Sequence, residues 1–472
     1  MRVAAGVVAM GVLAVAAWLA GALPGGDPGA GLRLHGLGST SGRFQLGLAL
    51  WLAGSIALAV IWWRVRHTRQ AVRWTVLAGS LWAAPLLFAP PLASRDVYAY
   101  ACQGDLWLAG LDPYRLGVAD GGCLWTPSVP ELWWHTPTPY GPLAVILSGA
   151  AVALARVFSH DLDTQLAITV TMLRLIALGG LALLAWGATR LKKGLWLGLV
   201  TPLVAVHAVS GAHNDALMAG LIVAGLAAAG ECLREPPEVR SATRMRHDWL
   251  LAGVFLGGAV SVKVTALAAV PFVLLLLPPW RLRWAGAATS VGTFAALTLA
   301  SGLDLGWARA LTRTGDLQQW TSLPTGAGMA VGYLLRALGQ PGAMSASITV
   351  ARALGLVALV IIAGYALRRA WNAPPTTVIA ACGWVLAAVA VLGPVFYPWY
   401  AIAPLAVLAC ATESWGRTRA AVTVALCFLV LPNGLGLAVL TKGPGAFLAL
   451  AAAIGLAVWG LRAARARPTA RA

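Results

Sequence analysis

Charged residues are scarce in this 472-residue chain, where Asp, Glu, Lys and Arg together make up 11% and hydrophobic residues 59%. An average soluble protein carries about 25% charged residues. The chain therefore has too little polar surface to cover a water-soluble body. Its apolar residues recur in runs of about 15–22 along the whole length, which is typical of membrane-spanning helices. The composition excludes a soluble enzyme and predicts an all-α polytopic membrane protein.

Signatures of several other protein classes are also missing from the sequence. The six cysteines form no CxxC pair and no Cys–His spacing typical of zinc. No Gly-rich phosphate loop follows a predicted strand. The net charge of +18 comes from short basic clusters between apolar runs, not from a basic face interleaved with aromatics. We therefore expect no metal, no other cofactor and no nucleic-acid partner. Cys102 and Cys123 share one predicted loop and are candidates for a disulfide, although helix packing in lipid does not require one.

The basic clusters set the expected orientation in the plasma membrane. Placing them in the cytoplasm puts 22 of the 34 Lys and Arg residues on that side, as the positive-inside rule requires. Of the 16 acidic residues, 11 then fall on the outer face. Both termini are expected in the cytoplasm, and the chemistry is expected on the outer face.

About 13–14 transmembrane helices are expected, interrupted by two long outer loops. The regions are N-terminal helices (1–93), a first outer loop (94–165), central helices (166–303), a second outer loop (304–345), and C-terminal helices with a basic tail (346–472). If the apolar stretch 141–158 crossed the membrane, the basic cluster of Arg190, Lys192 and Lys193 would lie on the outer face. We therefore expect a re-entrant or interfacial helix there, which does not cross. Several spans beside the loops are short, which predicts a hollow in the outer leaflet. The expected spans are 3–22, 45–63, 74–93, 166–188, 195–210, 214–230, 249–262, 264–279, 286–303, 346–366, 376–396, 399–412, 421–437 and 444–461.

The densest polar cluster is Ser94-Arg95-Asp96-Val97-Tyr98-Ala99-Tyr100, directly after the third expected span. One interpretation is an interfacial belt in which a snorkelling Arg95 pairs with Asp96. The functional interpretation makes Asp96 a general base, because a partly desolvated carboxylate has a raised pKa and accepts a sugar-hydroxyl proton more readily.

Two further polar features lie between apolar runs on the expected outer side. His213, Asn214 and Asp215 are consecutive, and Lys263 stands alone. A simple turn and a snorkelling lysine are the structural alternatives. Ionisable residues at membrane depth nevertheless suggest function. We predict that His213, Asn214 and Asp215 bind phosphate or sugar, with Asp215 orienting His213, and that Lys263 binds a lipid phosphate. A metal held by His213, Asp215 and Asp96 is the weaker alternative.

Aromatic and turn residues supply the remaining candidates. Turn chemistry or an aromatic belt explains them structurally. Their rings and hydroxyls also suit sugar binding, so we predict a lining for the sugar or acceptor formed by Tyr98, Tyr100, Asp112, Tyr114, Tyr140, Tyr397 and Trp399.

Taken together, these stretches resemble the MptB-like polyprenol-phosphate-mannose-dependent α-1,6-mannosyltransferases of the GT-C superfamily. The matching stretches are SRDVYAYACQG (94–104), GLDPYR (110–115), TPTPYGPL (136–143), GAHNDALMAG (211–220), the Lys263 neighbourhood, LPTGAG (323–328) and YPWY (397–400). The resemblance implies a GT-C fold and a lipid-phosphate donor used on the outer face. It also implies that Asp96 is the base of an inverting transfer, while His213, Asn214, Asp215 and Lys263, with Arg95, hold the donor.

We therefore predict transfer of mannose from polyprenyl-phosphate-mannose to an α-1,6-mannan acceptor of the lipomannan type. The expected partners are the lipid donor, the mannan or lipoglycan acceptor and membrane lipid, and the expected state is a monomer. One alternative is a transferase for another lipid-phosphate sugar, such as arabinofuranose. Others are a transporter of lipid-linked sugars, which has no need of a base at Asp96, and a scaffold subunit.

Overall fold

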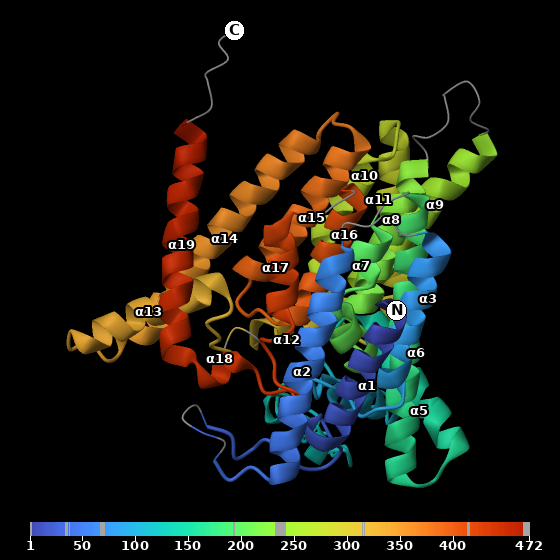
Figure 1. Ribbon diagram of the computed structural model, residues 1–472. Coiled ribbons are helices and arrows are strands. Elements are labelled where there is room, and N and C mark those ends of the chain that lie inside the picture. Colours follow the sequence, from blue (N-terminus) through green and yellow to red (C-terminus); the bar gives the residue numbers. More distant parts are fainter. Residues whose placement is uncertain are drawn as a thin grey trace.

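Helices make up the regular structure of the residues that the computed structural model describes, 2–33, 36, 38–66, 71–191, 194–231, 242–313, 315, 317–412 and 416–465 (Figure 1). Within these ranges β-structure is limited to two isolated bridges, Arg33 with Gly36 and Val430 with Gly436. The elements are α1 (Arg2–Ala20), α2 (Gly42–Val65), α3 (Val72–Leu87), α4 (Asp96–Leu108), η1 (Thr126–Ser128), η2 (Glu131–Trp133), α5 (Pro142–Phe158), α6 (Leu162–Arg190), α7 (Leu195–Leu199), η3 (Val204–Ser210), α8 (Asp215–Glu231), α9 (Ala242–Val262), η4 (Val264–Ala269), α10 (Val270–Leu275), α11 (Trp280–Ser301), α12 (Trp307–Arg313), α13 (Leu323–Ala337), α14 (Ala343–Ala370), α15 (Pro375–Leu392), η6 (Pro398–Ala401), α16 (Ile402–Ala411), α17 (Arg417–Leu426), α18 (Leu437–Leu440) and α19 (Lys442–Arg465).

Six of the described helices are long and apolar enough to cross a bilayer: α1, α2, α6, α14, α15 and α19. The π-helix η3 and the following α8 together pass the same test, but they are bent by 106° at the break between them. Repeated apolar helices of this length identify an all-α polytopic membrane protein. Fewer helices pass this test than the 13–14 spans expected from the sequence, because several expected spans are broken or short.

Three of the expected spans are interrupted in the structure. The expected span 195–210 divides into α7 and the π-helix η3. The expected span 264–279 forms two short helices, η4 and α10. Lys263 lies directly before η4, and its extended backbone ends α9. In the expected span 421–437, α17 ends at Leu426, and Gly434 supplies a turn with φ of +96°. Asn433 lies in that turn and donates to Asp27 Oδ1 over 2.9 Å.

Long helices pack side by side around these broken elements. α1 packs along α2, and α6, α8, α9 and α11 follow one another as contacting neighbours. In Figure 1, α13 lies across α14 and α19 at one edge of the molecule, and both helices contact it. α13 begins with Pro324 in its first turn and is capped by Ser322, whose hydroxyl accepts from the Thr325 amide.

The first long loop (94–165) folds into a body with its own apolar core. α4, η1 and η2 surround buried side chains that include Tyr98, Tyr100 and Trp133. Cys102 and Cys123 form a disulfide across this loop. The stretch 141–158 is helical as α5, which begins with Pro142 and packs on α4 and α6. Its re-entrant or interfacial course remains a prediction.

Gly141, in the first long loop, packs directly against the break between α9 and η4. The Gly141 amide donates to the Val262 carbonyl over 3.1 Å. A Cβ at Gly141 would lie 2.3 Å from the Ser261 carbonyl oxygen, closer than any side chain tolerates. The glycine therefore permits the approach that brings Tyr140 to Lys263.

Candidate active site

Asp96 opens α4, so its carboxylate sits at a helix N-terminus, where the helix dipole favours negative charge. Its Oδ1 accepts a hydrogen bond of 3.1 Å from the Trp133 indole, and its amide donates to Ser94 Oγ. Burial raises the pKa of Asp96 to about 6, against the opposing effects of the Trp133 bond and of the Lys263 charge, while Asp215 adds to the rise. The carboxylate is therefore ionised at neutral pH but basic enough to take a proton.

Arg95 and Tyr98, on either side of Asp96, turn into the loop body. The Arg95 guanidinium donates to the carbonyls of Ser128, Gly25 and Gly26. The Tyr98 hydroxyl donates to the Ala22 carbonyl over 2.6 Å. Both side chains are buried and tie the residues before α2 to the start of α4. They fix the position of Asp96, and neither lines the cavity described below.

Lys263 and Asp215 form an ion pair buried within the protein. Lys263 Nζ lies 3.0 Å from each carboxylate oxygen of Asp215. It also lies 3.9 Å from the centre of the Tyr400 ring, within cation–π distance. Asp215 is the first residue of α8, and Lys263 occupies the extended break after α9. The partner of Asp215 is thus Lys263, not His213 as the sequence suggested.

His213 belongs to a row of aromatic rings beside this pair. Its Nδ1 lies 3.2 Å from the Tyr100 hydroxyl, which lies 3.4 Å from the Tyr140 hydroxyl. The imidazole stacks on Trp399 at 3.9 Å between ring centres, and Trp399 stacks on Tyr397 at 4.6 Å. The row joins α4 and the first loop to η6.

Asn214 faces a different recess. It borders a small space lined also by Ala144, Leu173 and Leu217. Asn214 does not border the cavity that Lys263 and Asp215 line.

A cavity of about 180 Å³ opens beside the ion pair. Its polar end is formed by Asp215, Lys263, Tyr140 and Trp133. Trp133 therefore borders the cavity while its indole nitrogen holds Asp96. The rest of the wall is mainly apolar and comes from α8, η4, α12, α15, α16 and the segment after α15. It includes Leu311, Leu386, Val389, Ala390, Pro394, Val395 and Tyr397. A polar end joined to an apolar wall suits an amphiphile with an anionic head and a hydrocarbon chain.

A polar segment of the second long loop (304–345) holds that wall in place. Side chains of residues 319–325 bond to the chain at 393–397, the break between α15 and η6. Gln319 donates to the Tyr397 hydroxyl over 2.8 Å. The other bonds run from Thr321 to the Phe396 carbonyl, from Ser322 to the Gly393 carbonyl and from Thr325 to the Pro394 carbonyl. These bonds join the segment that includes the start of LPTGAG (323–328) to the segment that leads into YPWY (397–400).

Arg352 adds a guanidinium to the same fastening. It lies on α14, and it donates to Thr325 Oγ1 over 2.9 Å and to the carbonyls of Leu317 and Pro394. Sequence reasoning passed over Arg352 and Gln319. Arg352 is a lone arginine in an apolar run, which is a sequence signal for a functional or structural role. Nothing in the sequence points to Gln319.

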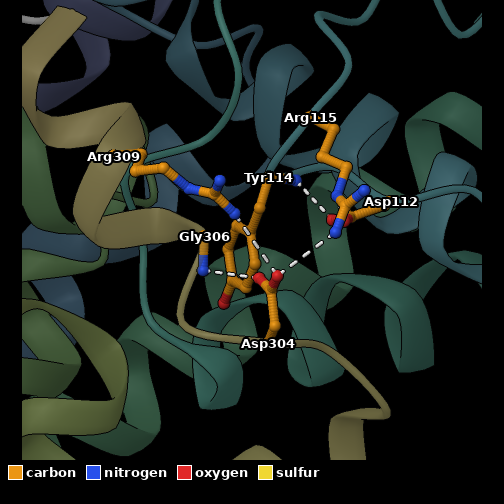
Figure 2. A network of polar contacts seen from close by, with 6 residues as sticks. All are labelled: Asp112, Tyr114, Arg115, Asp304, Gly306 and Arg309. Carbon is orange, nitrogen blue, oxygen red and sulfur yellow. Dashed lines mark hydrogen bonds and ion pairs between the residues drawn. The ribbon is translucent and has the colours of Figure 1, made fainter.

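Asp112 and Tyr114, predicted to line the sugar site, lie instead in a network that joins the two long loops (Figure 2). Arg115 Nε is 3.0 Å from Asp112, and Arg115 and Arg309 both reach Asp304, at 3.4 and 3.5 Å. Figure 2 shows the Gly306 amide donating to Asp304 as well, over 2.6 Å. Neither Asp112 nor Tyr114 borders the cavity.

Metal ligands do not gather at this site. Across the described residues, no group of three or more His, Cys, Asp or Glu side chains is arranged to hold a metal ion. Asp215 is engaged by Lys263, and His213 by Tyr100 and Trp399.

Comparisons with known proteins assign the chain to a family. Residues 3–279 match the N-terminal domain of the alpha-(1→6)-mannopyranosyltransferase family, and residues 324–462 match the MptB C-terminal domain. A probable alpha-(1→6)-mannopyranosyltransferase of Mycolicibacterium smegmatis is 32% identical, over 90% of this chain and 81% of its own. An alpha-(1→6)-mannopyranosyltransferase of Mycobacterium tuberculosis is 31% identical with the same coverage. Alpha-(1→6)-mannopyranosyltransferase B of Corynebacterium glutamicum is 27% identical, over 76% of this chain and 62% of its own. No solved structure matches the chain. A polytopic membrane protein with these matches along both halves belongs to the alpha-(1→6)-mannopyranosyltransferase family of glycosyltransferases.

Proposed function

We propose that this protein transfers mannose from polyprenyl-phosphate-mannose to the end of an α-1,6-linked mannan, on the outer face of the plasma membrane. Family membership supports mannosyl transfer. The donor class is supported by the cavity, in which a lysine lies at the polar end of an apolar wall. That one observation carries the proposal.

The apolar wall and Lys263 would bind different parts of the donor, the wall its polyprenyl chain and Lys263 its phosphate. The apolar part of the cavity includes Leu386 and Val389 on α15, a helix long enough to span the membrane. A polyprenyl chain can lie along it while the phosphate reaches Lys263. Lys263 is a point charge suited to a phosphate, and it stabilises the negative charge that grows on the phosphate as the sugar leaves.

Asp96 supplies the base in this mechanism. An acceptor hydroxyl attacks the anomeric carbon from the face opposite the phosphate, and Asp96 takes the hydroxyl proton. The bond from the anomeric carbon to the phosphate oxygen breaks, and the polyprenyl phosphate leaves with its electron pair. One such displacement inverts a β-linked donor into an α-linked product. The raised pKa of Asp96 and its fixed bond to Trp133 support this role.

The outer-face location has two supports. Positive clusters orient the loops, and the Cys102–Cys123 disulfide lies in the same loop as Asp96. Disulfides persist in oxidising compartments outside the cytoplasm. On the same orientation both termini are cytoplasmic.

The test uses purified full-length protein in detergent with radiolabelled polyprenyl-phosphate-mannose and a short α-1,6-mannoside. Wild type should elongate the acceptor, and Asp96→Asn should lower the rate about 10²–10⁴-fold, the usual contribution of a positioned base. Asp112→Asn is the matched control, because Asp112 lies in the same loop but in the surface network.

Each failure has a separate meaning. Retained turnover in Asp96→Asn would remove the base assignment. Transport of the lipid-linked sugar by both proteins without elongation would favour the transporter. Elongation with a different lipid-phosphate sugar, and none with mannose, would keep the reaction class and change the donor.

A further inference from the structure

The cation at the polar end of the cavity is already balanced before any substrate binds. Both carboxylate oxygens of Asp215 lie 3.0 Å from Lys263 Nζ. Among the described residues that border this cavity, Lys263 is the one Lys or Arg. The pair therefore brings no net positive charge to the place where a phosphate would bind.

An ammonium group has three N–H donors and no acceptor. Two point at Asp215 in this structure, and the Tyr400 ring covers another side of the nitrogen at 3.9 Å from its centre. An anion that takes the remaining donor becomes a neighbour of the Asp215 carboxylate. Its first negative charge is attracted by Lys263 and repelled by Asp215. A second charge meets the same balanced pair, so it gains little net attraction while its desolvation costs more.

Lipid phosphates differ in this charge. A phosphodiester, such as a lipid-phosphate sugar, carries one negative charge at neutral pH. A phosphomonoester carries about 1.5 to 2, because its second pKa is about 6. Sugar transfer converts the first into the second, while Asp96 becomes neutral by gaining the acceptor proton. The product lipid phosphate thus carries more charge beside Asp215 than the donor did.

We propose that Asp215 is a specificity-determining residue that selects lipid phosphates by charge, admitting singly charged phosphodiesters and disfavouring lipid mono- and diphosphates, which carry two or more charges. The inference rests on the proposed function, since it takes the Lys263 cavity as the donor site. It gives the buried pair two consequences. Lipid-diphosphate sugars are excluded as donors, and the lipid phosphate formed by transfer is released instead of retained.

The experiment measures binding of three non-transferable lipids to purified full-length protein in detergent. The probes are a short polyprenyl phosphate, its methyl phosphodiester and the corresponding diphosphate, each used to displace a labelled lipid phosphodiester. Measurements near pH 8, about two units above the second phosphate pKa, keep the monoester doubly charged. The methyl group keeps the sizes of the first two probes close, so their difference reports charge.

In wild type we expect the phosphodiester to bind about tenfold more tightly than the monophosphate, because the monophosphate carries one extra charge that no further cation balances. The diphosphate carries about two extra charges and should bind at least as weakly as the monophosphate. In Asp215→Asn the order should reverse, because Lys263 then offers an unopposed charge. The variant should also show stronger inhibition of transfer by polyprenyl phosphate. Asp215→Glu keeps the negative charge and should keep the wild-type order, as should Asp304→Asn in the surface network.

An unchanged order in folded Asp215→Asn would overturn the role of Asp215. Tighter binding of the doubly charged lipids to wild type would overturn it too, and this comparison stands even if Asp215→Asn does not fold. Absence of binding of all three probes to wild type would reject charge selection at this cavity. Failure of the proposed function is a different result, the absence of mannosyl transfer by wild type in the elongation assay.

Discussion

The buried ion pair of the cavity and the surface network of the two long loops use the same chemistry in different surroundings. Lys263 and Asp215 have side chains that are 10% and 2% exposed, whereas those of Arg115 and Asp112 are 67% and 28% exposed. An exposed pair is screened by water and contributes roughly 0–1 kcal/mol. A buried pair loses its solvation, so removal of one partner strands a charge. Burial therefore suits the Lys263–Asp215 pair to a chemical role, whereas the exposed Arg115 contacts serve to hold the two loops together.

The largest expected difference in stability comes from removing the cation of the buried pair, Lys263, or that of the exposed pair, Arg115. Lys263→Met strands Asp215 and should lower the free energy of unfolding by about 3–5 kcal/mol, with loss of transfer. Arg115→Met should change it by less than about 1 kcal/mol. Thermal unfolding and elongation assays on both variants measure these effects. Equal losses in the two variants would contradict the distinction between the pairs.

Lys263→Arg is the conservative companion to that variant. It keeps the charge next to Asp215 and should therefore restore most of the lost stability. Its apparent KM for the lipid donor should remain raised, because a planar guanidinium does not place its donors as an ammonium does.

The pH dependence of transfer should show the raised pKa of the buried acid. Asp96 must be ionised to accept a proton, and its pKa is raised from 3.8 to about 6. The active form is therefore present above pH 6 and lost as the pH falls through 6. We expect kcat/KM to fall about tenfold per pH unit below that point. Asp304→Asn should show the same profile, whereas a rate that stays flat down to pH 5 would refute the raised pKa.

A smaller effect is expected from the segment that fastens the cavity wall. Gln319→Leu removes the bond to Tyr397, which stacks on Trp399. Loss of one hydrogen bond of about 1 kcal/mol corresponds to roughly a fivefold rise in the KM for the donor, with kcat nearly unchanged. Gln319→Glu should recover part of it, because its carboxylate can accept from the tyrosine hydroxyl. A fall in kcat at constant KM would assign Gln319 a different role.

The smallest effect is expected from removing divalent metals. Excess chelator should leave the elongation rate nearly unchanged, because Asp215 is engaged by Lys263, and His213 by Tyr100 and Trp399. Activity that disappears with chelator and returns with added metal would support a site built on Asp96, Asp215 and His213 instead.

Much of the fold class followed from the sequence, but the course of the helices did not. Apolar runs predicted a polytopic helical membrane protein, because runs of this length can be buried in lipid. They did not predict that α17 ends at Leu426 or that η3 is a π-helix bent against α8. Hydropathy reports whether a residue can lie in lipid, whereas the course of the chain between helices depends on tertiary partners, such as Asp27 for Asn433.

The candidate site shows the same division. The sequence singled out Asp96, Asp215, Lys263, Tyr140 and Tyr397, which the structure places around or beside one cavity. It also singled out Asp112 and Tyr114, which belong to the surface network, and Arg95, whose donors are used by backbone carbonyls. A polar residue beside an apolar run is visible in sequence, but the direction of its side chain is not.

The sequence by itself determined that this chain lies in a membrane, which family it resembles and which acids and cations are available for chemistry. Those properties follow from composition, hydropathy and short motifs, which need no knowledge of neighbours. The tertiary structure alone decided that Asp215 pairs with Lys263, 48 residues away, and that Trp133 holds Asp96. The energy of a charge depends on its surroundings, and those surroundings are assembled from segments that the sequence keeps apart.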